Sequence, residues 1–149
     1  MSLLLEPYTL RQLTLPNRIA VSPMCQYSAV DGLANDWHLV HLGSRAVGGA
    51  GLVISEAVAV TADGRITAED LGLWDDAQIA PLQRITRFIT AQGAVAGIQL
   101  AHAGRKASTY RPWLGKPGSV KLEEGGWQPV GPSKIAFDPQ HTAPRELSQ

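Results

Sequence analysis

The fold class is indicated by one stretch of the sequence, Leu52-Val53-Ile54-Ser55-Glu56-Ala57-Val58-Ala59-Val60. It is nearly continuous in apolar residues and rich in β-branched ones, which is typical of a strand covered on both faces. Such strands occur mainly in parallel sheets that carry helices. We therefore expect helices and further parallel strands to alternate on either side of it.

A helix is expected before this stretch, over residues 36–47. Asn35 or Asp36 is placed to cap its amino end, and Gly48-Gly49 is placed to end it. The spacing of three or four residues that is typical of one helix face occurs at Trp37, Val40, Ser44 and Val47. The first helix thus leads directly into the strand at 52–60.

A second helix is expected after the strand and ends at Gly93. Its regular part begins near Pro81, because a missing amide costs nothing in the first turn. Apolar residues recur along it at Ile79, Leu82, Ile85 and Phe88/Ile89. The segments 18–22 and 95–100 are expected to be the remaining strands.

The order is therefore strand, helix, strand, helix, strand. This alternation predicts right-handed βαβ units and a parallel sheet, which is an α/β fold. Ahead of it, the alternating segments 8–10 and 13–15 predict a small hairpin that caps one end of the fold.

Residues 102–147 lack a helical period. This segment holds six of the ten prolines and six glycines. Loops of this length in compact domains are usually functional or disordered. Four apolar residues are spread through it, so we expect an ordered excursion over the ligand-binding end of the sheet; the expected anchors are Trp113, Trp127, Ile135 and Phe137.

The composition is that of a globular, soluble protein of one or at most two domains. Among 149 residues, 44% are hydrophobic and 17% are charged. Thirteen basic and thirteen acidic side chains cancel, which argues against nucleic acid or an anionic membrane as a partner. The longest apolar stretch is far shorter than the ~20 residues of a spanning helix. One cysteine forms no internal disulfide, which favours the reducing cytoplasm.

The first candidate site is the stretch Ser22-Pro23-Met24-Cys25-Gln26-Tyr27. Pro23 cannot donate to a sheet ladder, so it should end the strand at 18–22. Backbone groups freed at the carboxyl end of a parallel strand are available to a ligand. Cys25 is either a small buried hydrophobic residue or a thiol that touches a bound cofactor.

The second candidate site is the stretch Gln99-Leu100-Ala101-His102-Ala103-Gly104-Arg105-Lys106. Gln99 stands near the end of a strand expected to be buried, where an unpaired amide is unfavourable. Its amide either closes the core through a backbone hydrogen bond or pairs with an imide-like ring edge. Arg105 and Lys106 are better explained as loop anchors than as catalysts.

Two other motifs are weak. His38 and His41 are three residues apart on a helix and could reach one metal ion. No cysteine pair or acidic partner stands at ligand spacing, so helix-surface or core histidines are the better interpretation. The glycines of Gly48-Gly49-Ala50-Gly51 close a helix rather than open one, unlike a dinucleotide-binding loop.

Several stretches taken together resemble the old yellow enzyme family. They are Ser22-Pro23-Met24-Cys25-Gln26-Tyr27, Trp37-His38, Gly48-Gly49-Ala50-Gly51, Glu56-Ala57-Val58-Ala59-Val60, Gly64-Arg65-Ile66 and the stretch from Gln99 to Lys106. The Cys-x-Tyr form is similar to that of the thermophilic-like branch, which includes xenobiotic reductases. The resemblance covers essentially the whole chain.

The resemblance implies a flavin-dependent (β/α)8 TIM barrel. It implies transfer of a hydride from NADPH or NADH to FMN, and from flavin N5 to the β-carbon of an activated alkene. The same resemblance implies roles for individual residues. Flavin contacts would come from Ser22, Pro23, Met24, Cys25, Ala57 and Gln99; Cys25 would also tune the flavin potential, and Tyr27 would wall the substrate pocket.

A barrel of this kind needs ~250 residues. We therefore expect residues 1–149 to be the N-terminal part of one FMN-binding domain: the hairpin and about three βα units, with 102–147 as the loop over the ligand end. The family's substrate histidines, proton-donating tyrosine and phosphate site are expected outside the chain. A complementary chain, or a truncated barrel, would account for this, and association into an oligomer is expected.

Two other functions remain open from the sequence. One is a non-catalytic half-barrel that associates with a partner but holds no flavin by itself. The other is a different α/β enzyme, such as an aldolase or hydrolase, which the lack of a lysine or nucleophile at a strand end disfavours.

Overall fold

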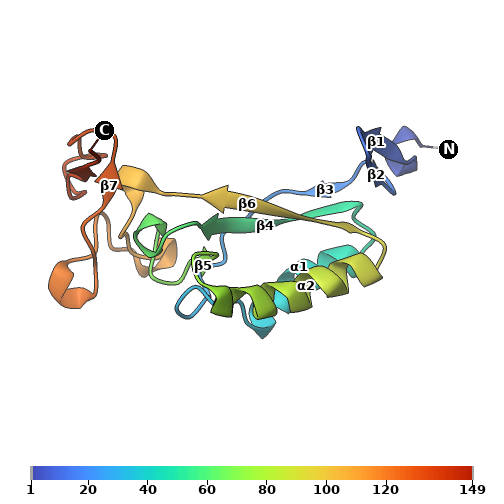
Figure 1. Cartoon of the computed structure of the whole chain (residues 1–149), viewed down its shortest axis with the longest axis horizontal. Coiled ribbons are helices and arrows are strands. Elements are labelled where there is room, and N and C mark those ends of the chain that lie inside the picture. Colours follow the sequence, from blue (N-terminus) through green and yellow to red (C-terminus); the bar gives the residue numbers. More distant parts are fainter. Residues whose placement is uncertain (1, 149) are drawn as a thin grey trace.

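The computed structural model describes residues 2–148, so Met1 and Gln149, the two ends of the expected 1–149 unit, lie outside the described residues. Its centre is a four-stranded parallel sheet (Figure 1). The strands are β3 (Ala20–Val21), β4 (Leu52–Ala59), β5 (Leu71–Gly72) and β6 (Val95–Ala101). β4 pairs with the other three, which confirms the expected parallel sheet.

The first strand is shorter than the predicted 18–22. β3 pairs with the amino-terminal half of β4, from Ala20 opposite Leu52 to Val21 opposite Val53. Pro23 follows and has no amide for the ladder. Farther along β4, β5 pairs at Val58 and Ala59 while β6 pairs with these residues at the other edge. β5 was not predicted from the sequence. It pairs with the same edge of β4 as β3 does, beyond the point where β3 ends.

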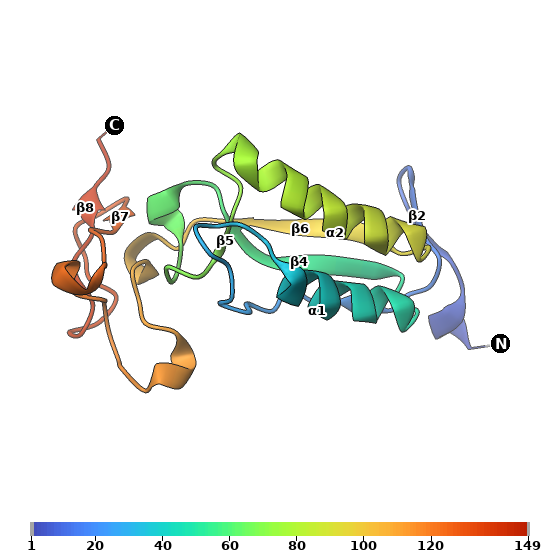
Figure 2. The same ribbon diagram turned by 90° about the horizontal axis from the view of Figure 1, so that it is seen from below.

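Two helices, α1 (Asp36–Val47) and α2 (Ile79–Ala91), cover one face of the sheet (Figure 2). α1 begins at the predicted cap, since the side chain of Asn35 accepts a hydrogen bond from Trp37 N–H. α2 begins with Pro81 in its first turn, where no amide is needed. The core between helices and sheet includes Leu42, Ala46, Val53, Val58, Leu71, Ile85 and Ile89.

The face of α1 marked by the spacing of Trp37, Val40 and Val47 is exposed. These side chains are 59%, 67% and 63% accessible. The buried face instead carries a histidine, a leucine and two small residues, namely His38, Leu42, Gly43 and Ala46. Small residues are needed there because α2 packs closely, and a Cβ on Gly43 would lie 2.9 Å from the Phe88 ring.

A β-bulge interrupts β4 in its middle. Ile54 pairs with Gly97 and Ala57 pairs with Gln99, so Ser55 and Glu56 together stand opposite Ile98. The extra residue resets the alternation of side chains along the strand. As a result Val53 and Val58, five residues apart, both lie in the core beneath the helices.

The hairpin and the carboxyl-terminal segment lie at opposite ends of the sheet (Figure 1). β1 (Tyr8–Leu10) and β2 (Leu13–Leu15) form the predicted antiparallel hairpin, after a 3₁₀ turn at Leu3–Leu5. The hairpin lies at the end where the parallel strands begin. Among residues 2–148, no helix is long and apolar enough to cross a membrane.

Beyond β6 the chain forms short 3₁₀ turns and one two-stranded pair, β7 (Val130–Gly131) with β8 (Arg145–Glu146). The 3₁₀ turns beyond β6 are Gly104–Lys106, Pro112–Leu114 and Leu122–Glu124. Earlier in the described residues, two more follow the first one, at Ala62–Gly64 and Asp76–Gln78. The segment beyond β6 lies past the carboxyl ends of β4 and β6 (Figure 1).

The prediction that four apolar residues anchor this segment is wrong for three of them, because their side chains are exposed. Trp113, Ile135 and Phe137 are 60%, 61% and 43% accessible. Trp127 alone is half-buried among the four. The segment is held instead by polar contacts: Trp127 Nε1–H donates to Asp63 O at 2.9 Å, and Ser108 Oγ accepts from Trp127 N–H at 2.8 Å. Its many prolines and glycines favour such a hydrogen-bonded loop over a packed one.

Candidate functional site

Three strand ends meet at the carboxyl edge of the sheet. The chain leaves β3 through the Ser22–Tyr27 turn, while Ala57 and Gln99 lie near the ends of β4 and β6. Ala57 and Gln99 are register partners, so they project from the same face of the sheet. The backbone amide of Ala57 lies near the Cys25 sulfur and lowers the pKa of its thiol. The turn and both strands therefore meet at one place.

A cleft of about 270 Å³ runs along this edge. Ala57, Ala59, Asp70, Gln99, His102 and Lys106 are among its lining residues. Two of these are alanines on β4, whose short side chains leave the sheet surface open. His102 and Lys106 come from the second candidate stretch, in which Lys106 was expected to anchor the loop.

Gln99 is not the buried amide that its strand suggested. Its side chain is exposed, and it forms no side-chain hydrogen bond with the other described residues. The reason is that β6 is an open edge, as Ile98 and Leu100 on either side of Gln99 are 46% and 59% accessible. Both the donor and the acceptor of this amide are therefore free to bind a ligand.

The turn at the end of β3 exposes Ser22 and Met24 and half-buries Pro23, Cys25 and Tyr27. The backbone N–H groups of Met24 and Cys25 form no hydrogen bond with other described residues. Burial raises the pKa of the Cys25 thiol, and the Ala57 amide works against that rise. The thiol is therefore a neutral group at the edge of the cleft.

Tyr27 closes one side of this turn. Its φ of 48° places it in the left-handed region, which is unfavourable for a bulky residue. Burial raises the pKa of its phenol to about 12, and the neighbouring Cys25 adds to that rise. The Trp113 ring meets the Tyr27 ring edge-on, with centroids 5.7 Å apart. Tyr27 thus joins the turn to the segment beyond β6.

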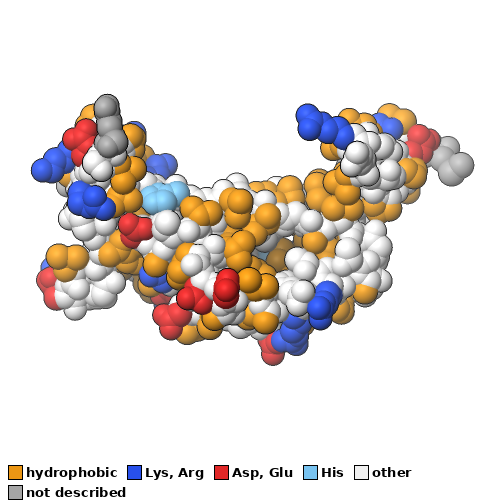
Figure 3. Space-filling view, in the orientation of Figure 1, with side chains coloured by type: hydrophobic (Ala, Val, Ile, Leu, Met, Phe, Trp, Pro, Cys, Tyr) orange, Lys and Arg blue, Asp and Glu red, His pale blue; other side chains and the backbone are white. Residues whose placement is uncertain are grey.

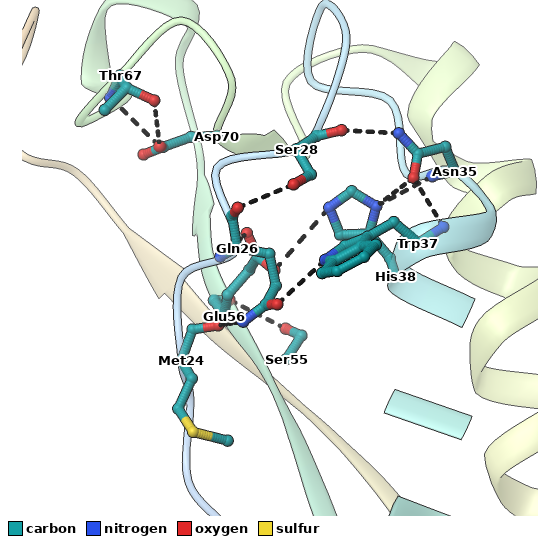
Figure 4. Close-up of polar contacts among 10 residues, drawn as sticks. All are labelled: Met24, Gln26, Ser28, Asn35, Trp37, His38, Ser55, Glu56, Thr67 and Asp70. Atoms are coloured by element: carbon teal, nitrogen blue, oxygen red, sulfur yellow. Dashed lines mark hydrogen bonds and ion pairs between the residues drawn. The ribbon is translucent and has the colours of Figure 1, made fainter. Parts of the chain in front are cut away.

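Two buried ionisable residues lie beside the turn: Glu56, which was not expected to be a site residue, and His38, for which a core position was one of the two interpretations. Glu56 lies in the β-bulge and is 2% accessible; burial raises the pKa of its carboxyl to about 7. His38 of α1 is fully buried, and burial lowers the pKa of its imidazole to about 4. Figure 4 shows the two side chains facing each other below the turn.

Asp70, just before β5, is a third buried carboxyl. It accepts hydrogen bonds from the Ile66 and Thr67 amides at 2.7 and 3.2 Å. Burial raises the pKa of this carboxyl, although these bonds oppose the shift. Among residues 2–148, no group of three or more His, Cys, Asp or Glu side chains is placed to hold a metal ion.

A larger apolar cavity, of about 830 Å³, lies away from these residues. It runs between α2 and the open edge of the sheet and is lined by Leu73, Ile79, Leu82 and Ile98, among others. Its polar lining residues are Asp75, Asp76, Gln83 and Thr86, and none of the residues expected to contact a ligand lines it. We interpret it as a packing surface rather than a ligand site.

The chain has clear relatives. The profile of the NADH:flavin oxidoreductase / NADH oxidase family matches residues 3–139. An NADH:flavin oxidoreductase of Gibberella zeae is 54% identical over 132 residues, which is 87% of this chain and 32% of that protein. An NADPH dehydrogenase of Listeria monocytogenes is 48% identical over 151 residues, covering 100% of this chain and 40% of that protein.

Solved structures have the same arrangement of elements. Morphinone reductase superposes with a TM-score of 0.80 at 27% identity, covering 97% of this chain and 39% of that protein. The old yellow enzyme homologue from Zymomonas mobilis gives a TM-score of 0.75 at 26% identity, with 97% and 39% covered. The chain thus spans 32% to 40% of the length of these relatives.

Proposed function

Since this chain belongs to the NADH:flavin oxidoreductase / NADH oxidase family, of old yellow enzyme type, we propose that it is part of an ene-reductase. In that enzyme it would form the edge of the barrel that contacts the flavin. In this family the fold is a (β/α)8 barrel, of which the hairpin and the first parallel strands are present here. The reaction would pass a hydride from NADPH or NADH through FMN to an activated alkene. The observation that carries this proposal is the meeting of Cys25, Ala57 and Gln99 at one edge of the cleft.

The residues present fit a flat ring with a polar edge. Ala57 and Ala59 leave an open surface on β4, and the Gln99 amide offers one donor and one acceptor without a protein partner. The unpaired N–H groups of Met24 and Cys25 are further donors. Bound FMN would supply the redox chemistry, and the protein would supply binding, orientation and tuning. The cofactor contacts are assigned to Ser22, Pro23, Met24, Cys25, Ala57 and Gln99.

Cys25 and Tyr27 would act on the two sides of the ring. A neutral thiol that lies beside the Ala57 amide and the Tyr27 side chain suits the role of tuning the flavin potential. Tyr27 and Trp113 together present an aromatic wall beside the cleft. We assign this wall to the substrate pocket.

Activity would require the rest of the barrel. In the described residues β6 is an open edge, and Ile98 and Leu100 on it are exposed. Figure 3 shows apolar side chains gathered over the middle of the molecule between its two raised ends. Unpaired edges and large apolar surfaces favour association. The proposed partner is the polypeptide that carries the remaining strands, and residues 1–149 would form one domain with it, with 102–147 as the loop over the ligand end.

The sole cysteine is unpaired, which is consistent with the reducing cytoplasm as the location. An alternative function is a half-barrel interaction module without flavin. The observation that favours it is the extent of apolar surface, which includes the cavity of about 830 Å³ beside β6.

One experiment separates the two functions. The chain is purified with whatever associates with it, the assembly is weighed by native mass spectrometry, and its flavin absorbance is recorded. A yellow complex with a second polypeptide is the expected result. A colourless complex would favour the interaction module. A colourless monomer that added FMN does not restore would contradict the enzymatic proposal for this chain.

A further inference from the structure

A buried carboxylate lies directly beneath the turn that carries Cys25. Glu56 Oε1 accepts a hydrogen bond from Gln26 N–H at 3.1 Å, and the Tyr27 backbone amide lies near the same carboxyl group and lowers its pKa. The two amides are consecutive in the turn. Glu56 reaches them because it occupies the β-bulge, which turns its side chain away from the regular alternation of β4.

The left-handed conformation of Tyr27 is explained by this contact. Successive amides converge on one anion in the arrangement called a nest, which needs a left-handed residue. Tyr27 has a φ of 48°, unfavourable for a side chain of its size. The hydrogen bond to Glu56 compensates for that strain. Without the carboxyl group, the Gln26 amide would lose its acceptor in a half-buried turn, which is unfavourable.

His38 faces the second oxygen of the same carboxyl group. Asn35 N–H donates to His38 Nδ1 at 3.1 Å, so Nδ1 is an acceptor and the neutral ring carries its proton on Nε2. His38 Nε2 and Glu56 Oε2 are 3.9 Å apart, and neither has another partner among the described residues. Because the Asn35 amide occupies Nδ1 of His38, the Nε2–H group of His38 faces Oε2 of Glu56.

Residues at the amino end of α1 also form hydrogen bonds with the turn. Gln26 is the link: its Nε2–H donates to Met24 O at 2.8 Å, and its Oε1 accepts from Trp37 Nε1–H at 3.1 Å. Asn35 Nδ2–H donates to Ser28 O at 2.7 Å. Figure 4 shows these contacts on both sides of the turn. The amino end of α1 and the bulge of β4 thus enclose the turn.

We propose that Glu56, oriented by His38, is the positioning residue of this site: its carboxylate holds the Cys25–Tyr27 turn in its left-handed conformation and thereby aims the Cys25 thiol. Its importance for the reaction rests on the function proposed above, in which Cys25 tunes the flavin. The positioning itself is a property of this chain and is measurable without flavin.

Glu56 accepts hydrogen bonds in both protonation states, but the ionised form accepts them more strongly. The titratable groups around it come from every neighbouring element: His38 from α1, Asp70 from the segment before β5, and Cys25 and Tyr27 from the turn. Burial raises the pKa of Glu56 to about 7, and the nearby Asp70 charge adds to that rise. The strength of its bonds to the turn should therefore change near neutral pH.

The test follows the Gln26 and Tyr27 amides by ¹H–¹⁵N NMR from pH 5 to pH 9, on the full chain without flavin. The two amides are expected to shift downfield together, with one midpoint near pH 7. In Glu56→Gln the common step should be lost, and alkylation of Cys25 by iodoacetamide at pH 8 should become several-fold faster. In Glu56→Asp, which keeps the charge, a common step should remain.

Asp70→Asn is the matched control. Asp70 is also a buried carboxyl group that accepts two backbone amides, from Ile66 and Thr67. Its substitution should move those two amides and keep the common titration step of Gln26 and Tyr27, with its midpoint at lower pH because the Asp70 charge contributes to the raised pKa of Glu56. Wild-type amides that do not titrate together, or a step that persists in Glu56→Gln, would overturn the proposal. If Glu56→Gln does not fold, the wild-type titration and Glu56→Asp still decide. If the two amides titrate together but the protein binds no flavin, the positioning role of Glu56 stands and only the proposed function is contradicted.

Discussion

Ala57 on β4 and Gln99 on β6 stand directly opposite each other, on the same face of the sheet and near its carboxyl end. The pairing is possible because the bulge at Ser55 and Glu56 shifts the register by one residue before Ala57. Without that shift, Glu56 rather than Ala57 would stand opposite Gln99 and present its side chain to the cleft. The bulge thus both exposes a small residue to the cleft and turns Glu56 towards the Cys25 turn.

Gln99→Ala should weaken FMN binding to the assembled barrel by about tenfold or more, because a ligand edge loses a donor and an acceptor. Fluorescence titration of FMN measures the change. Gln12→Ala, at the tip of the hairpin on the opposite end of the sheet, is the control and should leave the affinity unchanged. Equal affinity in Gln99→Ala would show that this amide does not contact the flavin.

Cys25→Ala should change the flavin reduction potential while FMN stays bound. A hydrogen bond of about 1 kcal/mol corresponds to roughly 20 mV for a two-electron couple. A spectroelectrochemical titration of the assembled enzyme measures this shift. Cys25→Ser keeps a group that can accept from the Ala57 amide, so its potential should lie nearer to wild type. An unchanged potential in Cys25→Ala would rule out the proposed contact.

Asn35→Ala should lower the free energy of unfolding by about 1 kcal/mol or more through loss of the helix cap. The side chain accepts from Trp37 N–H and donates to Ser28 O, so both the helix and the turn lose a contact. Asn35→Asp keeps the acceptor and should lose less. Urea unfolding of the chain measures the difference. Equal loss in both variants would mean that the bond to Ser28, not the cap, carries the stability.

The stability of the wild type relative to Glu56→Gln should fall as the pH rises. Folding raises the pKa of Glu56 from 4.5 to about 7, so between these values the folded state binds more protons than the unfolded state. Its contribution is fully present below pH 4.5 and is lost as the pH rises through 7. Urea unfolding at pH 5 and pH 8 should show a relative loss on the order of 2 kcal/mol.

His38 has the opposite slope, since burial lowers its pKa from 6.5 to about 4 and stability is lost as the pH falls through that range. Because His38 is present in both the wild type and Glu56→Gln, the comparison largely cancels its effect. A difference between the two proteins that does not vary with pH would show that Glu56 is not titrating in the folded state.

Ile98→Lys should prevent the chain from associating with the remaining part of the barrel. Ile98 lines the apolar cavity beside α2 and is 46% accessible on the open edge strand. A charge there would be buried by any added βα unit. Analytical ultracentrifugation of the two polypeptides measures association. Leu122→Lys, on an exposed residue of the segment beyond β6, should associate as the wild type does.

The candidate site was only partly foreseeable. Cys25 and Ala57 lie near each other because they follow the ends of neighbouring strands, and their contact with flavin stays a prediction. Gln99 lies on the same face, but its exposure depends on β6 being an edge, which no local pattern reveals. Glu56 was not recognised as a site residue, and His38 was considered only as a weak metal ligand or a helix-surface or core histidine, because neither segment shows that the two residues face each other. They are functional candidates only as a pair, and their pairing depends on a bulge whose position is set by contacts between strands.

The sequence by itself determined the hairpin, the two helices with their ends, and the alternation that makes the sheet parallel. These depend on local signals, such as the Asn35 cap and the glycine stop after α1, which act within a few residues. Only the tertiary structure decided which face of α1 is buried, that β5 continues the edge of β3, and that Glu56 lies under the Cys25 turn. Each of these depends on residues that are distant in the chain and are brought together only when the sheet and helices pack.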